Sequence, residues 1–397
     1  MKITNVEAML CDGGWWPWIF IKIETDEGIT GWGECSDNRQ NPYAVLGCVE
    51  DLKFLLKGSD PRQVENLYWQ MYRMTRANLG GVVQKTIAGI ELALWDIKAK
   101  ALNISVSELM GGPLRTKFRV YWSHCGTYRA LYPEMLGVAP FRSLKQIAEL
   151  GAEVRERGFT ALKTNMIVPG DPATTISTID GVVTRKMLLQ IEELMATFRD
   201  AVGPDIDIAL DGNFNFNMES TIKIAHVVEQ FSPMWLELDC YDPKALWEIR
   251  RASRVPICSG ESLYTMRQYK PYFDEHCMDV AMIDVLWNGL SESRRIAALA
   301  DICEVPVGPH NYYSHYATLI SAHFCSLLPN MKIMEVDVDS IPWREELLTT
   351  PFSIKEGYLT LPEGPGFGSD LNEAVIRKHP WEPSKADALK LKRIRGD

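Results

Sequence analysis

DIALDGN, residues 207–213, is a short apolar run that ends on the carboxylate of Asp211 and then turns at a glycine. Seven other stretches share this form, in which a β-like apolar run has a polar ending and a helical pattern after it. In chain order the eight are RVYWSHC (119–125), ALKTNMI (161–167), DIALDGN (207–213), MWLELD (234–239), PICSGES (256–262), VAMIDVL (280–286), VPVGPHN (305–311) and KIMEVDV (332–338). The later polar endings, at positions 211, 237, 261, 284, 310 and 335, lie 23 to 26 residues apart, about the length of one strand, one helix and two loops. The pattern predicts an α/β fold built as a (β/α)₈ barrel, with a doubly wound sheet as the alternative.

The first 115 residues follow a different pattern, in which strands come before helices. Residues 2–11 and 18–35 alternate apolar and polar side chains, and Asp26-Glu27-Gly28 marks a hairpin turn between two β-rich runs. Residues 82–102 carry apolar residues three and four apart, as an amphipathic helix does, and Gly111-Gly112-Pro113 ends this region. We therefore expect an N-terminal α+β domain over residues 1–115 and a barrel domain over residues 116–340.

The composition excludes several classes of partner. The net charge is −10, whereas nucleic acids and anionic membranes attract basic surfaces. No run approaches the roughly 18 apolar residues of a membrane span, and the N-terminus lacks a signal-peptide core. The nine cysteines contain no CxxC pair, which indicates reduced thiols in a cytoplasmic protein and neither a disulfide framework nor a zinc site. We expect a homo-oligomer that binds no nucleic acid and no membrane.

Three successive predicted strands end on carboxylates, at Asp211, Glu237 and Glu261. A strand-end carboxylate often only caps the next helix, but in a barrel these three would meet on one rim. Unpaired carboxylates so close together repel one another unless a cation lies between them. Oxygen ligands favour Mg²⁺, which keeps coordination positions for water and substrate. Asn213 would point the same way as Asp211 and contact a ligand group or a water.

The other strand ends supply groups for proton transfer. Lys163 could stabilise negative charge on the carboxylate of a bound substrate, although a surface lysine is the simpler reading. Asp284 behind His310 would fix the tautomer of the imidazole and make it a general base or acid. Glu335 could, in its protonated form, donate a hydrogen bond to a substrate carboxylate. Together these groups predict an enzyme that removes the proton next to a carboxylate.

The sequence is similar to the enolase superfamily, in its mandelate racemase-like branch. The similarity rests on GITGWGEC (28–35), the helix at 86–112, LKTN (162–165), the acidic strand ends, MID (282–284) and GPHN (308–311). It implies a modified (β/α)₇β barrel under a capping domain, and a C-terminal segment, residues 341–397, that returns to the cap. The same resemblance implies Mg²⁺ as cofactor, with its site residues as follows: Asp211, Glu237 and Glu261 as metal ligands, Asp284 and His310 as the catalytic dyad, and Glu335 as the acid that binds the substrate carboxylate. A histidine or lysine base acting with Mg²⁺ is the known chemistry of this superfamily.

Lys163 matches the first lysine of the family's KxK motif, and Asn165 stands where the second lysine would be. The second lysine is the base on one face of the substrate, and an amide accepts no proton at neutral pH. Racemisation needs a base on each face, so the resemblance favours a one-base reaction in which His310 removes the α-proton and returns it to a departing β-hydroxyl. The predicted reaction is dehydration of a sugar acid, an aldonate or aldarate, to a 2-keto-3-deoxy acid. Asn165 would then donate a hydrogen bond to this small carboxylate substrate.

Alternatives remain for the reaction and for one ligand. With His124 as a second base instead of a substrate contact, the protein would be an epimerase, a racemase or a cycloisomerase. A member that has lost catalysis would bind a sugar acid without converting it, although the complete metal set and dyad argue against this. The family's usual Glu-Glu-Pro is replaced by WLELDCYDP (235–243), so Asp239 is an alternative to Glu237 as a ligand.

The predicted cap carries two candidates for substrate contact. CDGGWWPWIF (11–20) places three tryptophans in a stretch marked by glycine and proline. Trp16 would line the pocket if this stretch is a lid that excludes water, whereas core or interface packing is the other reading. CSDNRQNPY (35–43) supplies Arg39 in a loop, where we expect it to contact the substrate.

Overall fold

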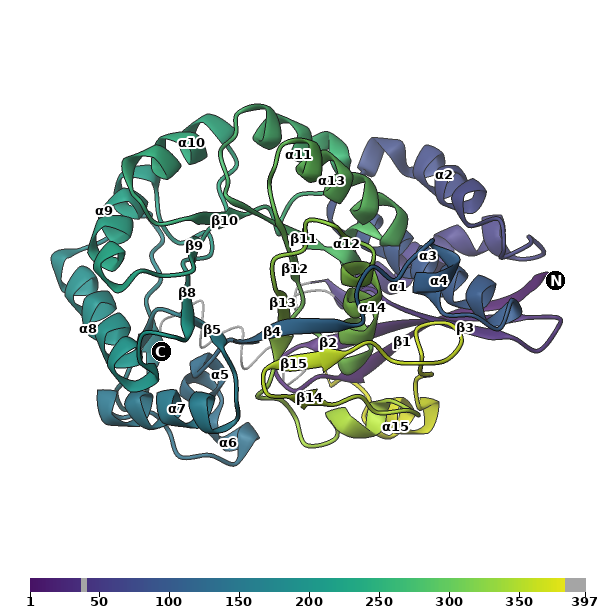
Figure 1. Cartoon of the computed structure of the whole chain (residues 1–397). Coiled ribbons are helices and arrows are strands. Elements are labelled where there is room, and N and C mark those ends of the chain that lie inside the picture. The colour runs from purple at the N-terminus through teal and green to yellow at the C-terminus, as the bar shows by residue number, and fades with distance from the viewer. Residues whose placement is uncertain (37–40, 383–397) are drawn as a thin grey trace.

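Figure 1 shows the computed structural model of the chain, which describes residues 1–36 and 41–382. Eight parallel strands form a ring, one from each predicted stretch. They are β4 (Lys117–Ser123), β5 (Ala161–Asn165), β8 (Asp207–Asp211), β9 (Trp235–Glu237), β10 (Ile257–Ser259), β11 (Val280–Asp284), β12 (Val307–His310) and β13 (Met334–Asp337). Neighbours pair in parallel from β4 to β12, and β13 returns to pair with β4. The barrel prediction is confirmed, and the doubly wound alternative is wrong because the strand order runs round to its start instead of reversing at a switch point.

The ring closes between β12 and β13 through single contacts. Val307 forms a parallel bridge with Met331, and the side-chain amide of Asn311 donates to the carbonyl of Glu335 at 3.0 Å. The interior of the barrel is filled by a separate cluster of buried side chains. They are Tyr121, Ala161, Ala209, Trp235, Cys258, Val280, Met282 and Ile333, all buried. This packed interior leaves the carboxyl ends of the strands as the place for a site.

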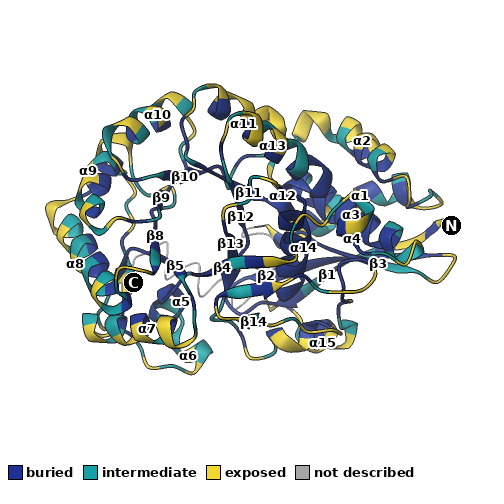
Figure 2. Ribbon diagram, in the orientation of Figure 1, coloured by how far each residue is buried: buried dark blue, intermediate teal, exposed yellow. Residues whose placement is uncertain are grey.

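Helices cover the outside of the ring, with their exposed faces turned outward (Figure 2). The principal helix after each of the first seven strands is α7 (Leu144–Glu156), α8 (Arg185–Val202), α9 (Met218–Val228), α10 (Pro243–Ala252), α11 (Thr265–Asp274), α13 (Leu290–Ile302) or α14 (His315–Ser326). Shorter elements fill the loops: α5 (Thr127–Leu131), α6 (Pro133–Leu136), β6 (Ile167–Val168), β7 (Thr174–Thr175), η2 (Glu229–Phe231) and α12 (Val285–Asn288). The eighth strand leads instead into η3 (Arg344–Leu347) and the C-terminal segment, which is the arrangement of a (β/α)₇β barrel.

The cap is an antiparallel sheet packed on helices, as the N-terminal pattern predicts. Its elements are β1 (Ile3–Asp12), β2 (Pro17–Thr25), β3 (Thr30–Glu34), α1 (Pro42–Leu56), α2 (Val64–Thr75), η1 (Arg76–Asn78), α3 (Gly81–Ala101) and α4 (Val106–Leu109). The glycines of the GWG motif let β3 approach α3 closely, since a Cβ on Gly33 would lie 2.0 Å from the carbonyl oxygen of Gly89. No side chain larger than hydrogen fits there.

The C-terminal segment runs from the barrel back to the cap. Its strands β14 (Ile354–Lys355) and β15 (Tyr358–Thr360) form a hairpin, and β15 pairs antiparallel with the beginning of β4. The chain then forms a bridge from Gly366 to Ser105, passes through α15 (Glu373–Lys378), and forms a bridge from Pro380 to Cys11 in β1. These contacts hold the cap over one end of the barrel.

Two buried carboxylates of the cap accept hydrogen bonds from the barrel. Glu34, at the end of β3, accepts a hydrogen bond from the hydroxyl of Ser314, the residue that caps α14. Glu91 on α3 accepts four: from the amides of Leu290 and Ser291 at 2.8 and 3.0 Å, and from the Ser291 hydroxyl and the indole of Trp95 at 2.6 Å each. Both carboxylates lie at helix N-termini, where the helix dipole and free N–H groups favour an anion.

Glu91→Gln is expected to destabilise the fold by roughly 2–4 kcal/mol, because an amide at this position turns its NH₂ group toward donors and leaves at least one of them buried and unpaired. The measurement is the free energy of unfolding in urea. Glu50→Gln on the exposed side of α1 is the matched control and should change it by less than about 0.5 kcal/mol. Equal stability of the two variants would show that Glu91 does not hold the cap to the barrel.

All nine cysteines lie within the described residues and are unpaired, as the sequence predicts. Six of them are buried, and burial raises the pKa of Cys258 well above its ordinary value, which makes that thiol unreactive. Within residues 1–36 and 41–382, no helix combines the length and the apolar character needed to cross a membrane.

Candidate active site

The carboxyl ends of the barrel strands open into a cavity of about 960 Å³, and the cap contributes Trp16, Gly80 and Lys85 to its wall. Of the residues predicted for the site, the wall includes Trp16, His124, Lys163, Asn165, Asp211, Asn213, Glu261 and His310. The other three, Glu237, Asp284 and Glu335, each contact one of these wall residues. Arg39 lies outside the described residues. The fold therefore brings together groups as far apart in the sequence as Trp16 of the cap and Glu335 of the barrel.

Lys163 is a buried ammonium held between two carboxylates. Its Nζ lies 2.5 Å from Glu237 Oε1 and 2.8 Å from Glu335 Oε1, and its side chain is 1% exposed. Burial alone lowers the pKa of Lys163, but the carboxylates of Glu237 and Glu335 raise it by more, so the net pKa lies well above its ordinary value. The surface-lysine reading is wrong, because this side chain is charged, buried and part of the cavity wall.

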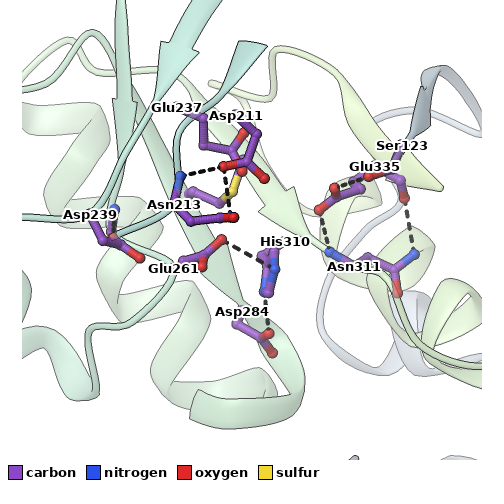
Figure 3. Close-up of polar contacts among 12 residues, drawn as sticks. Ser123, Asp211, Asn213, Glu237, Asp239, Glu261, Asp284, His310, Asn311 and Glu335 are labelled. Carbon is purple, nitrogen blue, oxygen red and sulfur yellow. Dashed lines mark hydrogen bonds and ion pairs between the residues drawn. The ribbon is translucent and has the colours of Figure 1, made fainter. Parts of the chain in front are cut away.

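Glu335 differs from the sequence prediction of a protonated acid. Burial raises the pKa of Glu335, but Lys163 and His310 together lower it to about 2. Its Oε1 accepts a hydrogen bond from the Ser123 hydroxyl at 2.5 Å, and its Oε2 accepts one from the backbone amide of Asn311 at 2.7 Å (Figure 3). Glu335 therefore holds Lys163 in position, and these contacts favour its ionised form over the protonated acid that the sequence suggested.

Asp211 is held in place by two amides. The side-chain NH₂ of Asn165 donates to its Oδ2 at 2.9 Å, and Asn213 donates to its Oδ1 from both the backbone N–H and the side chain, at 2.8 Å each. The carbonyl oxygen of Asn165 in turn accepts from the hydroxyl of Thr127 at 2.9 Å. Asn165, predicted to donate to the substrate, is thus committed first to orienting Asp211, and one of its two N–H bonds remains for another acceptor.

Four carboxylates, Asp211 among them, crowd this part of the rim. Glu237, Asp239 and Glu261 line a small hollow together with Asp211, and Figure 3 labels these four side chains. Burial raises the pKa of Glu237, and the neighbouring Asp211 and Glu335 add to the effect of burial, while Lys163 opposes it. Burial likewise raises the pKa of Glu261 to about 8, with His310 opposing and Asp239 and Asp211 adding. Such crowding favours either protonation or a bound cation.

This donor set fits a divalent cation in its chemistry. All the donors are carboxylate oxygens at the ends of the adjacent strands β8, β9 and β10 or within two residues after them, which suits Mg²⁺. Oδ2 of Asp239 is buried with no hydrogen-bond partner among the described residues, so one oxygen beside the hollow has its lone pairs available. In the side-chain positions seen here, no three His, Cys, Asp or Glu residues of the described chain converge on one point. Glu261 instead points Oε2 to His310 Nε2, 3.3 Å away.

The choice between Glu237 and Asp239 as ligand leads to a prediction. Glu237→Gln is expected to remove the rise in melting temperature that Mg²⁺ causes, because Glu237 pairs in register with Asp211 at the adjacent strand end. Asp239→Asn is expected to weaken Mg²⁺ binding by roughly 10–100-fold, as outer groups around metal sites do. Thermal melts over a Mg²⁺ titration measure both effects. The reverse ranking of the two variants would assign the ligand to Asp239.

His310 and Asp284 form the predicted dyad. His310 Nδ1 lies 2.6 Å from Asp284 Oδ2, which also accepts the hydroxyl proton of Tyr313 at 2.6 Å. The backbone amide of Trp287 donates to Asp284 Oδ1 at 3.0 Å. Burial lowers the pKa of His310, but Glu261 and Asp284 raise it to about 10. The imidazole can therefore accept a proton from a substrate only when Glu261 no longer contacts Nε2.

The cap tryptophans divide between packing and the cavity. Trp15 and Trp18 are 2% exposed and belong to the core. Trp16 lines the cavity, with its ring centroid 5.2 Å from Tyr312 and 5.8 Å from Tyr128. Trp15 and Trp18 thus fit the packing interpretation, and Trp16 lies in the cavity wall, as the sequence predicts, while its role in a lid stays a prediction.

Asp337 and Tyr128 are among the residues at the site that were not predicted from the sequence. Asp337 contacts Nδ1 of His124 at 2.9 Å, and the hydroxyl of Tyr128 donates to Asp337 at 2.9 Å. Strand alternation places Asp337 on the same face as Glu335 two residues earlier, and this signal could have identified it. Tyr128 follows a turn in which His124 has φ +47°, a conformation that the sequence pattern does not reveal.

Comparisons with known proteins agree over both parts of the chain. Residues 146–375 match the family model described as enolase C-terminal domain-like, and residues 15–111 match the N-terminal domain of the mandelate racemase / muconate lactonizing enzyme family. D-gluconate dehydratase of Thermoproteus tenax is 28% identical over 92% of this chain and 70% of its own length. D-xylonate dehydratase of Haloferax volcanii is 27% identical over 95% of this chain and 89% of its own. A crystal structure from Burkholderia xenovorans strain LB400, provisionally named L-alanine-DL-glutamate epimerase and bound to magnesium and fumarate, is 39% identical with a TM-score of 0.92 and covers 96% of each chain.

Proposed function

The chain belongs to the mandelate racemase / muconate lactonizing enzyme family, and we propose that it is a Mg²⁺-dependent dehydratase of a sugar acid. The family and the dehydratases among the relatives support an enzyme of this class. The substrate we propose is an aldonate or aldarate, and the product is the corresponding 2-keto-3-deoxy acid.

The observation that carries the proposal is the asymmetry between the two sides of the cavity. On one side, His310 has a buried carboxylate behind it and Nε2 at the cavity, as a general base requires. On the side of β5, Asn165 replaces a lysine and its amide holds Asp211. An amide takes no proton, so the described site offers one base at this pair of positions. One base suffices for dehydration.

Lys163, His310 and Asp284 would have separate functions in the abstraction of the α-proton. Lys163, fixed between Glu237 and Glu335, presents its charge at the cavity wall, where it would neutralise charge that develops on the substrate carboxylate. His310 Nε2 would accept the α-proton, and Asp284 would keep the imidazole in the required tautomer. A divalent cation held by Asp211, Glu237 and Glu261 would add positive charge near the same carboxylate. Trp16 and Tyr312 would limit the access of water to the reacting carbon.

An epimerase is the second candidate, and two observations favour it. The Burkholderia xenovorans relative, at 39% identity, carries an epimerase name. His124 also faces the cavity and could supply a base in place of the missing lysine.

The test is incubation of the protein with Mg²⁺ in D₂O, followed by proton NMR, against a panel of aldonates, aldarates and the dipeptide L-Ala-L-Glu. A dehydratase converts one sugar acid to a 2-keto-3-deoxy product that carries deuterium at C3. An epimerase instead places deuterium at the α-carbon and gives both configurations without loss of water. A compound that raises the melting temperature but stays unchanged at long times would indicate a binding protein and overturn both candidates.

A further inference from the structure

His124 is a second imidazole in the cavity with a carboxylate at its Nδ1. We propose that His124 is the general acid that protonates the departing β-hydroxyl. The inference rests on the proposed dehydratase function and adds residues to it. Asp337 and Tyr128 become positioning residues for His124. His310 then carries out proton abstraction alone, in place of the double role expected from the sequence.

The surroundings of the two imidazoles match. In the dyad of His310 and Asp284, the carboxylate also accepts a tyrosine hydroxyl. His124 Nδ1 lies 2.9 Å from Asp337 Oδ1, and Tyr128 donates its hydroxyl proton to Asp337 Oδ2 at 2.9 Å. Asp337 is 5% exposed and faces the ring of His124 from within the fold, as the buried Asp284 faces His310. A buried carboxylate behind an imidazole, itself held by a tyrosine, therefore occurs twice in this cavity.

The hydrogen bonds around His124 determine its tautomer, that is, whether Nδ1, the nitrogen that contacts Asp337, carries a proton. Three oxygens lie near Nδ1: Asp337 Oδ1 at 2.9 Å, Tyr128 Oη at 3.0 Å and Ser123 Oγ at 3.2 Å. Tyr128 gives its proton to Asp337, and Ser123 gives its proton to Glu335, so neither hydroxyl donates to Nδ1. Nδ1 must therefore carry a hydrogen and donate it to Asp337. This leaves Nε2 for proton exchange with a substrate.

Aromatic contacts hold the His124 ring at the cavity wall. The ring stacks on Tyr128 with centroids 4.5 Å apart, and it meets Tyr312 at 5.8 Å. Tyr312 also lies 4.8 Å from the ring of His310, so the two imidazoles flank one tyrosine. Within residues 1–36 and 41–382, Nε2 of His124 makes no hydrogen bond. The ring is thus fixed at Nδ1 and available at Nε2, beside the group that removes the α-proton.

Dehydration needs a base for the α-proton and an acid for the leaving oxygen. His310 Nε2 takes the proton, and the electron pair of the C2–H bond forms the enediolate of the substrate carboxylate. This pair then forms the C2–C3 double bond while the C3–O bond breaks, and the hydroxyl takes a proton from Nε2 of His124 and leaves as water. The enol product tautomerises to the 2-keto-3-deoxy acid, and both imidazoles return to their starting forms by exchange with solvent.

His124→Gln tests the assignment, because glutamine can form hydrogen bonds but cannot transfer a proton. The variant is expected to dehydrate the sugar acid roughly 10²–10⁴-fold more slowly than wild type. It should still exchange the α-proton in D₂O, because His310 is intact. A substrate analogue with chloride in place of the β-hydroxyl needs no acid, so the variant should eliminate chloride at a rate within about fivefold of wild type. The same recovery is expected for Asp337→Asn and for Tyr128→Phe, which a merely structural role of these residues would not produce.

Controls separate this inference from the proposed function. His226→Gln, on the exposed side of α9 with its ring bonded to the carbonyl of Ala252, should leave both reactions unchanged. Wild-type protein that dehydrates no acid in the panel defeats the proposed function, and this inference with it. Wild-type protein that dehydrates an acid which His124→Gln converts equally well defeats the inference alone. Loss of α-proton exchange in a folded His124→Gln variant would assign His124 as a base instead.

Discussion

His310→Asn is expected to lower both product formation and α-proton exchange by at least roughly 10⁴-fold, the upper end of the effect of a general base. Asparagine retains a polar group near Asp284 but has no nitrogen that accepts a proton. Loss of exchange distinguishes this variant from His124→Gln, in which exchange should persist. The measurement is proton NMR in D₂O with the substrate identified in the panel and with its β-chloro analogue. The analogue should not rescue His310→Asn, because removal of the α-proton is still required.

The matched control is His226→Asn, an exposed histidine on the outside of the barrel. Its turnover should equal that of wild type within experimental error. If His310→Asn keeps measurable α-proton exchange while folded, the base lies elsewhere in the cavity, and the pairing of His310 with Asp284 would serve structure alone. A melting curve recorded for each variant verifies that a loss of rate is not a loss of fold.

Removal of divalent cations is expected to abolish turnover and to lower the melting temperature. The reason is the crowding of Asp211, Glu237 and Glu261 on one rim, where a cation relieves repulsion between buried carboxylates. At a Mg²⁺ concentration 100 times its dissociation constant, binding would stabilise the fold by about 2.7 kcal/mol. The experiment is dialysis against a chelator, followed by assay and melting with Mg²⁺ added back.

Asp211→Asn is the informative variant for this effect, because it removes the charge of one of the three carboxylates that we propose as ligands. It should stay folded, show no turnover, and show no response of its melting temperature to Mg²⁺. Asp205→Asn, at an exposed position before β8, should behave like wild type. These carboxylates do not form a metal site if turnover continues after chelation and the melting temperature does not change with Mg²⁺.

The elements of the barrel could be predicted because each carries its own local signal. Apolar runs that end on a polar residue identified all eight strands, and the endings of the last six recur at intervals of 23 to 26 residues. Since parallel strands of a barrel place their carboxyl ends on one rim, the same pattern also indicated that Lys163, Asp211, Glu261 and His310 would share a cavity. The recurring polar strand ends along the chain were sufficient to predict that these four residues lie in one cavity.

The roles of individual side chains could not be predicted from the sequence pattern where they depend on neighbours from other strands. Glu335 was expected to be protonated, yet Lys163 and two hydrogen-bond donors from separate segments keep it ionised. Asn165 was expected to bind substrate, yet Thr127 and Asp211 engage its amide. A protonation state or a hydrogen-bond partner is set by distances between segments far apart in sequence, and these distances exist only once the ring has closed.

The sequence by itself determined the barrel, its cap, the rim on which the polar strand ends meet, and the replacement of a lysine by Asn165. The barrel, the N-terminal domain and the rim follow from residue type and spacing, and the replaced lysine follows from the resemblance to the family's KxK motif. The tertiary structure decided that Lys163 is locked between Glu237 and Glu335, and that Asp337 and Tyr128 stand behind His124. The physical reason is that charge and hydrogen bonding act over a few ångströms, so their outcome depends on which side chains the fold places within that range.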